Sequence, residues 1–511
     1  MDSSNKTVAL VDVMNHDANT KMRIAVGLVY VGSALKKHGY KVKIFQPTKE
    51  KEIQQQVEQE IIKDNPLFVG FSAFIGSNLA MSLDMSERLK EALDVTIVWG
   101  GKFPSSIPDL VLKEDCIDVV CLGEGEETIV ELAKTFESGG SLDKIKGICY
   151  KADGRIVHNE EREPIHDLDS LEYDINLIQD WSKYVSILNG RIRIFDPFES
   201  QRGCPFSCNF CHQSMKMWSK NGKKIIRAHS VDWILKRAKQ LKELTGVEYI
   251  SFCDDEFWIK KSRAFELLEG LYSIGIKVNN LRMRFSSLQN EEMIERLIKY
   301  GILNMGFGLE SGSDRILGLM NKKQTTKQVE EKLRLVDKYP QMVCGGAIIL
   351  GSPGETKKDM IESVRFVLNM CQKYPRFRSE FYFYQPLPGT VFGNMAVDLG
   401  FDPPQSIREW AKVDGYSAHK IAKGWLPWFN RREEINFERA RRYISLARFD
   451  QTREDSQSSE KMGLIYRLKR RILRVFEILA AMRLYHWFFY FPIEFYILGA
   501  YRHLTEWTIE E

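Results

Sequence analysis

The chain has 511 residues, of which 44% are hydrophobic and 28% are charged. At roughly 100 to 200 residues per domain, this length predicts about three domains, and the apolar fraction is enough for packed cores, which excludes a disordered or purely fibrous protein. Lysine and arginine number 73 against 69 aspartate and glutamate, which gives a net charge of +4. No overall basic field therefore points to nucleic acid as a partner.

Cysteine content and the first residues indicate the compartment. Nine cysteines are too few for a disulfide framework in a chain of this length, and the chain does not begin with a basic stretch followed by an apolar one. Both features predict a reducing, cytoplasmic location. The most hydrophobic segment is interrupted by Glu477, Arg483 and Glu494, whereas a spanning helix needs about 18 uncharged apolar residues. Association with a membrane surface stays open.

The first 150 residues alternate short β-branched runs with helical periodicity. Strands are predicted at 8–14, 40–46, 67–74, 95–101, 117–123 and 146–150, with helices at 27–38 and 80–93. This alternation predicts an α/β domain, with a doubly wound parallel sheet, over residues 1–150. Residues 151–190 are polar and irregular, and we interpret them as a linker.

A second series of strands and helices follows over residues 191–400. Its predicted strands are 249–255, 281–287, 304–310, 345–351 and 380–386, and its helices include 262–274 and 326–339. The series predicts a partial or complete (β/α) barrel. Beyond it, residues 401–511 lack this alternation and are expected to be mostly helical, with a polar linker at 450–460.

Three cysteines on one short loop are the most informative motif. Cys204, Cys208 and Cys211 have the spacing C-x3-C-x2-C, and Gly203 and Pro205 break any helix or strand there. Three thiolates can hold three irons of a 4Fe-4S cluster and leave the fourth iron open to another ligand. A structural zinc site needs a fourth ligand, and the nearby His212 directly follows Cys211, which makes tetrahedral binding awkward.

The cysteine loop resembles the cluster motif of the radical SAM superfamily, in which the open iron binds S-adenosylmethionine (SAM). The resemblance spans roughly residues 195–395 and includes the segments SFCDDEFW, RMRFSS, GFGLESGS, GGAIILGSPGET and YFYQPLPGT in family order. It implies contacts to SAM from Phe210, Asp254, Asp255, Glu256, Arg284, Glu310, Ser311, Gly351 and Pro386.

Each of these polar residues also has a purely structural interpretation. Asp254, Asp255 and Glu256 suit a solvated strand end, Arg284 a surface ion pair, and Ser311 a helix N-cap.

The first domain resembles the cobalamin-binding domain that precedes the radical SAM domain in the class B subgroup. The similar segments are GLVYVGSALKKHGYKVKIF, VGFSAF, VWGGKFPSSIPDLVL and DVVCLGEGEETIVEL. The resemblance implies cobalamin contacts from Ser72, Phe74, Gly100, Gly101, Lys102, Gly123, Glu124 and Gly125, and in addition from the loop 15–22.

The first domain also departs from the family pattern. The motif D-x-H-x-x-G, whose histidine replaces the lower cobalt ligand, is absent, because neither His16 nor His38 has that spacing. Ala25 and Val26 stand where a proline is common, which puts the loop 15–22 in doubt. The alternative is a domain that kept the fold and lost the cofactor.

The C-terminal region contains a basic amphipathic stretch. Residues 464–487 carry Arg467, Lys469, Arg470, Arg471 and Arg474 among apolar residues, and five aromatic residues follow at 487–491. An ordinary helix closing the barrel explains this pattern. A helix resting on anionic lipid explains it as well, and would suit a lipid-like substrate.

Together the resemblances imply an enzyme with a 4Fe-4S cluster, SAM and cobalamin. The expected activity is C-methylation of an unactivated carbon through methylcobalamin and a 5′-deoxyadenosyl radical, on a small-molecule or lipid-like substrate, with flavodoxin or ferredoxin as reductant. Cyclisation, ring contraction or rearrangement with the same cofactors is the first alternative. A non-catalytic cobalamin or iron-sulfur sensor is the second alternative. A sensor would need only the cluster cysteines, whereas this chain also carries the segments that resemble SAM contacts.

Overall fold

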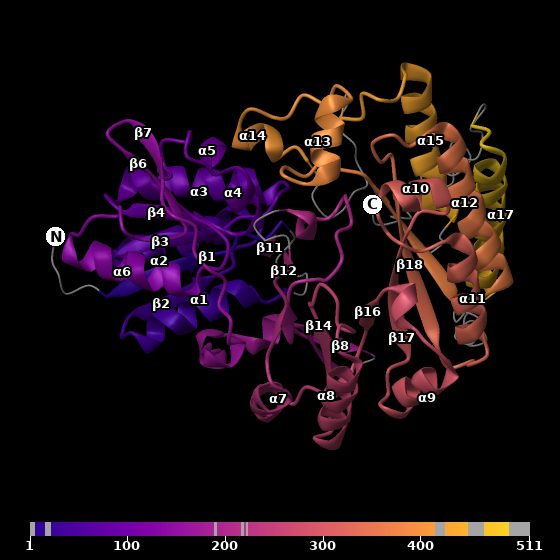
Figure 1. Cartoon of the computed structure of the whole chain (residues 1–511), viewed down its shortest axis with the longest axis horizontal. Helices are drawn as coiled ribbons and strands as arrows, with labels where there is room; N and C mark the ends of the chain where they lie inside the picture. Colours follow the sequence, from indigo (N-terminus) through magenta and orange to yellow (C-terminus); the bar gives the residue numbers. More distant parts are fainter. Residues whose placement is uncertain are drawn as a thin grey trace. The chain divides into compact units, whose positions relative to one another are not determined.

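The computed structural model describes residues 6–15, 22–188, 192–215, 219–220, 223–413, 425–447 and 464–489. Contacts divide the chain into two compact units. Unit 1 comprises Met1–Met283, Glu295–Leu303 and Gln385–Trp425, and unit 2 comprises Arg284–Ile294, Asn304–Tyr384 and Leu426–Glu511. The expected C-terminal region of 401–511 therefore divides between the units at residue 425. Figure 1 shows the order of the elements along the chain.

Unit 1 begins with a seven-stranded sheet of order β2-β1-β3-β4-β5-β6-β7. The strands are β1 (Thr7–Val11), β2 (Lys41–Phe45), β3 (Phe68–Ser72), β4 (Thr96–Gly100), β5 (Val119–Cys121), β6 (Ile148–Ala152) and β7 (Arg155–His158). The first five pair in parallel, which confirms the predicted parallel sheet, whereas β6 and β7 add an antiparallel edge. The sheet therefore continues past the predicted boundary at residue 150.

Helices cover both faces of this sheet. Leu10 of β1 packs in a core with Leu35 of α1 (Val26–Lys37) and Leu132 of α6 (Glu126–Ser138). Its neighbour Val11 belongs to the core on the other face, which includes Ile61 of α2 (Lys51–Asp64) and residues of α3 (Asn78–Ala92). Because successive side chains of a strand point to opposite faces, strands buried on both sides become almost continuously apolar.

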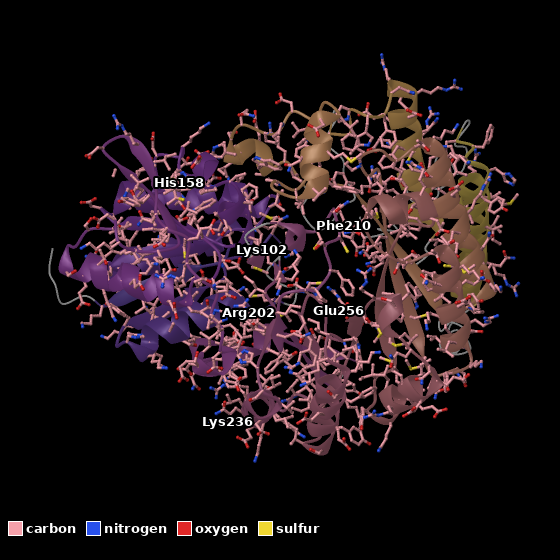
Figure 2. The ribbon with its side chains drawn as sticks, in the orientation of Figure 1. Lys102, His158, Arg202, Phe210, Lys236 and Glu256 are labelled. Atoms are coloured by element: carbon pink, nitrogen blue, oxygen red, sulfur yellow. The ribbon has the colours of Figure 1, made fainter. Side chains whose placement is uncertain are left out.

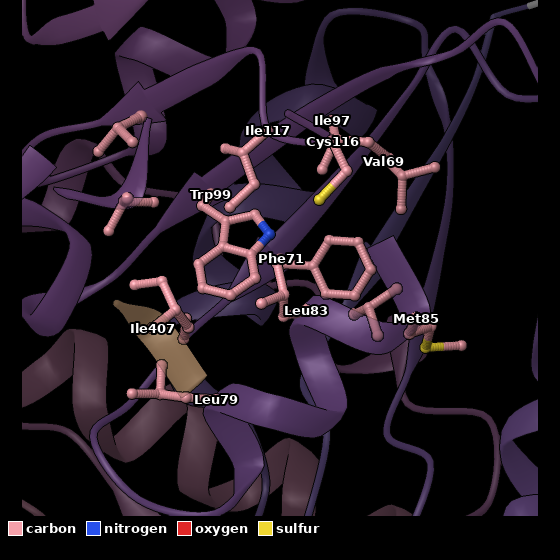
Figure 3. Packing of buried hydrophobic residues seen from close by; sticks show 14 of the residues in the cluster. Val69, Phe71, Leu79, Leu83, Met85, Ile97, Trp99, Cys116, Ile117 and Ile407 are labelled. Atoms are coloured by element: carbon pink, nitrogen blue, oxygen red, sulfur yellow. The ribbon is translucent and has the colours of Figure 1, made fainter. Parts of the chain in front are cut away.

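Figure 3 shows the second of these cores, around Trp99. Trp99 is fully buried, and its indole Nε1 donates to Ser86 Oγ at 3.1 Å. Ile407 of α14 (Ile407–Trp410) is buried in the same core, far along the chain from β4. Ile407, Trp410 and Val413 thus complete this core of the first domain, and α13 (Val391–Asp398) precedes them along the chain.

The rest of unit 1 is built on a four-stranded sheet of order β15-β14-β9-β8. Its strands are β8 (Val185–Leu188), β9 (Ile192–Phe198), β14 (Tyr249–Phe252) and β15 (Lys277–Val278), and the helices nearby are α7 (Val231–Thr245) and α8 (Lys261–Ser273). β9 and β14 are parallel, so the segments that follow them leave from the same edge. Neither β8 nor β9 was among the strands predicted from the sequence. β8 lies within the segment that we interpreted as a linker.

Unit 2 contains the parallel strands β17 (Asn304–Glu310), β18 (Val343–Leu350) and β19 (Phe377–Phe383). Its helices include α10 (Asp314–Leu319), α11 (Thr326–Asp337), α12 (Lys357–Lys373), α15 (Arg431–Ala447) and α17 (Leu464–His486). α17 packs against α15 and α12, as Figure 1 shows, and these helices confirm a helical C-terminal region. No helix in the described ranges is long and apolar enough to cross a membrane.

Candidate functional site

The three cysteines lie on the loop that follows β9 and the two-residue strand β10 (Gln201–Arg202). Gly203 has φ +94°, and a Cβ there would lie 2.2 Å from the backbone oxygen of Ile225. Only glycine fits this turn. The backbone N–H of Cys211 donates to the oxygen of Cys208 at 3.0 Å, which folds the loop back on itself.

The thiols suit an iron-sulfur cluster better than a single metal ion. Burial raises the pKa of Cys204 to about 11 and that of Cys211 to about 12, so ligation must supply the charge that favours the thiolates. No three His, Cys, Asp or Glu side chains of the described chain converge closely enough for one ion. An iron-sulfur cluster fits this loop, because each of its irons takes one thiolate and the three thiols do not have to converge on a single ion.

His212 does not complete a zinc site. Its Nε2 lies 2.7 Å from Lys102 Nζ and 3.9 Å from Asp255 Oδ1. Burial and the neighbouring Lys102 lower the pKa of His212 to about 3, which keeps the imidazole neutral and able to accept from the lysine. The ring therefore connects Lys102, a predicted cobalamin contact, to the loop that carries Cys204, Cys208 and Cys211, which we call the cluster loop.

The acidic run after β14 braces the two ends of the cluster loop. Asp254 accepts from the backbone N–H groups of Ser200 at 2.7 Å and Gln201 at 3.2 Å, and burial raises its pKa to about 7. Asp255 accepts from Gln213 Nε2 at 2.6 Å on the far side of the cysteines. Asp254 thus acts on the backbone before the loop, and the exposed Asp255 acts after it.

Two further predicted SAM residues of unit 1 lie near this loop. Phe210 is half-buried directly before the third cysteine, and Pro386 is buried in a segment that reaches the loop through the N–H of Phe392, which donates to Asn209 O at 2.9 Å. Glu256 is buried, and its Oε1 accepts from Trp258 N at 3.2 Å. Figure 2 labels Phe210 and Glu256 along the ribbon.

In unit 2, two predicted SAM residues share one lysine. Lys322 is buried, and its Nζ donates to Glu310 Oε1 at 2.9 Å, while its backbone oxygen accepts from Arg284. Glu310 ends β17 with φ +69°, a conformation that non-glycine residues rarely adopt and that often marks a functional site. Ser311 instead bonds Ser363 of α12, Oγ to Oγ at 2.9 Å, so its hydroxyl supports the fold.

Gly351, also in unit 2, directly follows β18 and has φ +84°. Its N–H donates to Glu355 Oε2 at 2.5 Å, and Ser352 N donates to the same oxygen at 2.9 Å. Burial raises the pKa of Glu355 to about 8. This carboxyl group fixes the turn that, by the family resemblance, is expected to contact the adenosine of SAM.

The predicted cobalamin residues lie at the carboxyl edge of the first sheet. Ser105 joins two of their loops, because its Oγ donates to Gly101 O at 2.7 Å and accepts from Gly123 N at 3.0 Å. Gly123 has φ +70°, and a Cβ there would meet nothing within 4 Å, so the backbone faces open space. Gly100 and Gly125 flank these turns, Ser72 is the last residue of β3, and Phe74 follows that strand at the same edge. Exposed backbone at a sheet edge fits a flat cofactor.

Neither His16 nor His38 has the spacing of the cobalt-ligating histidine motif. His38 follows the C-terminal end of α1, with Nδ1 2.9 Å from Ala34 O. Because α1 runs back from the carboxyl edge, His38 lies at the opposite edge. His16 and most of the loop 15–22 lie outside the described residues.

Sequence reasoning missed a buried charge cluster, which we call the Arg202 hub: Glu124, Glu126, Glu199 and Arg202, with Arg227. Arg202 directly precedes the cluster loop, and its guanidinium contacts Glu199 Oε1 at 2.9 Å, Glu126 Oε1 at 2.7 Å and Glu124 Oε1 at 3.3 Å. Arg227 Nη1 contacts Glu124 Oε2 at 2.8 Å. Figure 2 labels Arg202.

The hub changes the interpretation of Glu124, a predicted cobalamin contact. Burial raises the pKa of Glu124, but Arg227 and Arg202 outweigh it and hold that pKa below its usual value. Glu124 Oε2 also accepts from Ile165 N at 2.9 Å. Both carboxylate oxygens are thus engaged, and Glu124 ties the loop after β5 to the residue before the cluster loop.

Comparison with known proteins defines the class. Residues 23–133 match the B12 binding domain, and residues 198–367 match the Radical SAM superfamily. The chain therefore carries a B12-binding domain followed by a radical SAM domain, and it is a radical SAM enzyme. The cluster, SAM and cobalamin expected from the sequence are the cofactors of these two domains.

Its relatives include methyltransferases and a cyclase. An uncharacterised methyltransferase of Pyrococcus horikoshii is 26% identical over 410 residues, which cover 78% of this chain and 85% of the relative. The anaerobic magnesium-protoporphyrin IX monomethyl ester cyclase of Rubrivivax gelatinosus is 26% identical over 391 residues, or 73% of this chain and 66% of that protein.

Two solved structures share the fold. The radical SAM methyltransferase TsrM of Kitasatospora setae, with cobalamin and a 4Fe-4S cluster bound, has a TM-score of 0.62 at 16% identity, covering 78% of this chain and 76% of TsrM. OxsB, a cobalamin-dependent SAM radical enzyme with aqua-cobalamin bound, has a TM-score of 0.62 at 17% identity, covering 99% of this chain and 76% of OxsB.

Proposed function

We propose that this chain is a cobalamin-dependent radical SAM methyltransferase that transfers a methyl group to an unactivated carbon of a small-molecule substrate. The observation that supports this most strongly is the direct link between the two cofactor loops of unit 1. Lys102 Nζ, beside the cobalamin edge, lies 2.7 Å from the ring of His212, beside the cluster cysteines. A substrate held near SAM would therefore also lie near cobalamin.

The chain's own residues have distinct roles in this proposal. Cys204, Cys208 and Cys211 hold the cluster, and Asp254 and Asp255 fix the backbone on its two sides. When bound, the cluster and SAM supply a 5′-deoxyadenosyl radical, and cobalamin supplies a transferable methyl group.

The other SAM contacts follow from the same proposal. Phe210 and Pro386 are proposed SAM contacts, and Glu310, Arg284 and Gly351 are proposed as SAM contacts from the family resemblance. The loops at Gly101 and Gly123 would contact cobalamin through their backbone. A flavodoxin or ferredoxin is the proposed electron donor.

The test uses SAM with a deuterated methyl group, the anaerobically reconstituted enzyme, a chemical reductant and a small-molecule extract. We expect S-adenosylhomocysteine and 5′-deoxyadenosine to form together, with the deuterated methyl group in an extract component. The matched control is Cys208→Ala, which removes a cluster ligand and should abolish 5′-deoxyadenosine formation.

A second candidate, cyclisation, is favoured by the relative from Rubrivivax gelatinosus. It predicts 5′-deoxyadenosine that depends on the extract, without S-adenosylhomocysteine and without transfer of the label. That outcome would replace methylation by cyclisation or rearrangement as the function.

A further inference from the structure

The outer face of α17 in unit 2 is unusually apolar. Val475, Ile478 and Met482 are 55%, 54% and 55% exposed, and Tyr485 is 39% exposed. Of the sixteen large hydrophobic side chains that are exposed in the described ranges, six lie within residues 475–488, where Leu479 and Phe488 complete the set. Scattered exposed apolar residues are ordinary, but a concentration on one helix marks an interaction site.

This face is separate from the face that holds α17 in unit 2. Residues 475, 478, 482 and 485 recur at helical spacing and lie on one side of the helix. Phe476, Ala480 and Leu484 on the other side are buried, and α17 packs there against α15 and α12. Tyr485 borders α12, because the Arg365 guanidinium lies 5.1 Å from its ring, so the apolar face left unused by contacts within unit 2 is Val475, Ile478 and Met482.

Basic residues border the exposed face. Arg471 and Arg474 are exposed, and at 100° per residue they lie on the same side as Ile478, whereas Glu477 lies on another side. Over its full length α17 contains six lysines and arginines against one glutamate. A protein partner would need an acidic and apolar groove to match this face, but an anionic bilayer offers both properties everywhere.

We propose that Val475, Ile478 and Met482 of α17 rest in the surface of an anionic lipid bilayer, with Arg471 and Arg474 at the lipid headgroups. A 23-residue helix is about 35 Å long and lies flat in such a surface. The exposed Phe488, two residues after the end of the helix, suits the interfacial region, where aromatic rings are enriched. The proposal is independent of the reaction that the enzyme performs.

The test measures sedimentation of the full-length holoenzyme with vesicles of phosphatidylcholine alone or with about 30% phosphatidylglycerol. We expect binding to the anionic vesicles only, weakened by salt. The variant Arg471→Gln with Arg474→Gln should bind about 30-fold more weakly at low salt, since each basic residue contributes about fivefold. The variant Ile478→Gln with Met482→Gln should lose at least about tenfold.

The matched control is Leu244→Gln, which changes an equally exposed apolar residue, 53% exposed, on α7 of unit 1. It should bind vesicles as the unaltered chain does. No binding to anionic vesicles would overturn the proposal. Equal binding by all variants would also overturn it. So would a dimer in solution that is dissociated by the double variant Ile478→Gln with Met482→Gln.

Discussion

Replacing Arg202 by glutamine leaves three carboxylates of the Arg202 hub without their shared cation. The side chains are 5% (Glu126), 12% (Glu124) and 18% (Glu199) exposed, and Arg202 itself is 13% exposed. Arg227 still neutralises Glu124, so the loss falls mainly on Glu126 and Glu199. Removing one partner of a buried ion pair costs about 3 to 5 kcal/mol.

The assay is anaerobic thermal unfolding, together with iron and cobalt content. We expect Arg202→Gln to lower Tm by roughly 4 to 7 °C, since unit 1 spans about 330 residues and, at about 2.1 cal/mol/K per residue, shifts by about 1.4 °C per kcal/mol. Adding Glu126→Gln should restore about 1 to 3 kcal/mol, because it removes one of the buried charges. The control is Arg408→Gln, whose ion pairs to Asp84 and Glu87 are exposed and contribute about 1 kcal/mol or less.

The reasoning would be refuted if Arg202→Gln behaved like Arg408→Gln, or if Glu126→Gln added its own loss to that of Arg202→Gln. Either result would mean that the opposite charges of the Arg202 hub do not stabilise one another. The iron and cobalt contents distinguish a local effect from a general loss of stability. A local effect would lower both contents in a protein that is still folded at the assay temperature.

Three further predictions follow from single positions. Gly203→Ala should lose bound iron, because its Cβ would overlap Ile225 O, while Gly27→Ala, with open space around it, should keep its iron. Burial raises the pKa of Asp12 to about 7, so the unaltered chain loses stability as pH rises from about 4 to 7. Asp12→Asn cannot ionise at this position and should not lose that stability. The variant should therefore gain up to about 4 kcal/mol relative to the unaltered chain over this pH range. Ile407→Ala should cost about 2 to 4 kcal/mol in thermal unfolding, whereas a loss below about 1 kcal/mol would contradict its place in the core around Trp99.

Sequence patterns predicted the parallel sheet because its strands are short apolar runs separated by helical periodicity. Val8, Leu10 and Val11 belong to such a run, and their side chains are buried in the cores on the two faces of the sheet. The antiparallel strands β6 and β7 were harder, since a short edge strand has no distinctive period. The predicted strand 281–287 gives only β16 (Leu281–Met283) before a 3-10 turn at Phe285–Ser287.

The cluster loop was predictable because its chemistry is local. Three cysteines within eight residues identify it, whatever the rest of the chain does. The roles of Asp254 and Glu124 depend on partners more than 50 residues away, Ser200 and Arg202, so no spacing rule connects them. Long-range pairs of this kind are set by topology, and a single sequence does not display them.

The Arg202 hub and Ile407 show the same limit. Arg202 was visible in the sequence beside the cysteines, but nothing there paired it with Glu126, 76 residues earlier. Ile407 is an ordinary apolar residue in a region without clear periodicity, and only its burial reveals that it completes the first domain.

The central claim is that one chain holds both a 4Fe-4S cluster and cobalamin. The most direct test counts iron, sulfide and cobalt in the full chain, purified anaerobically after expression with added cobalamin. The account predicts about four irons and about one cobalt per chain. About four irons with no cobalt would contradict it and leave a radical SAM enzyme whose first domain is only a scaffold.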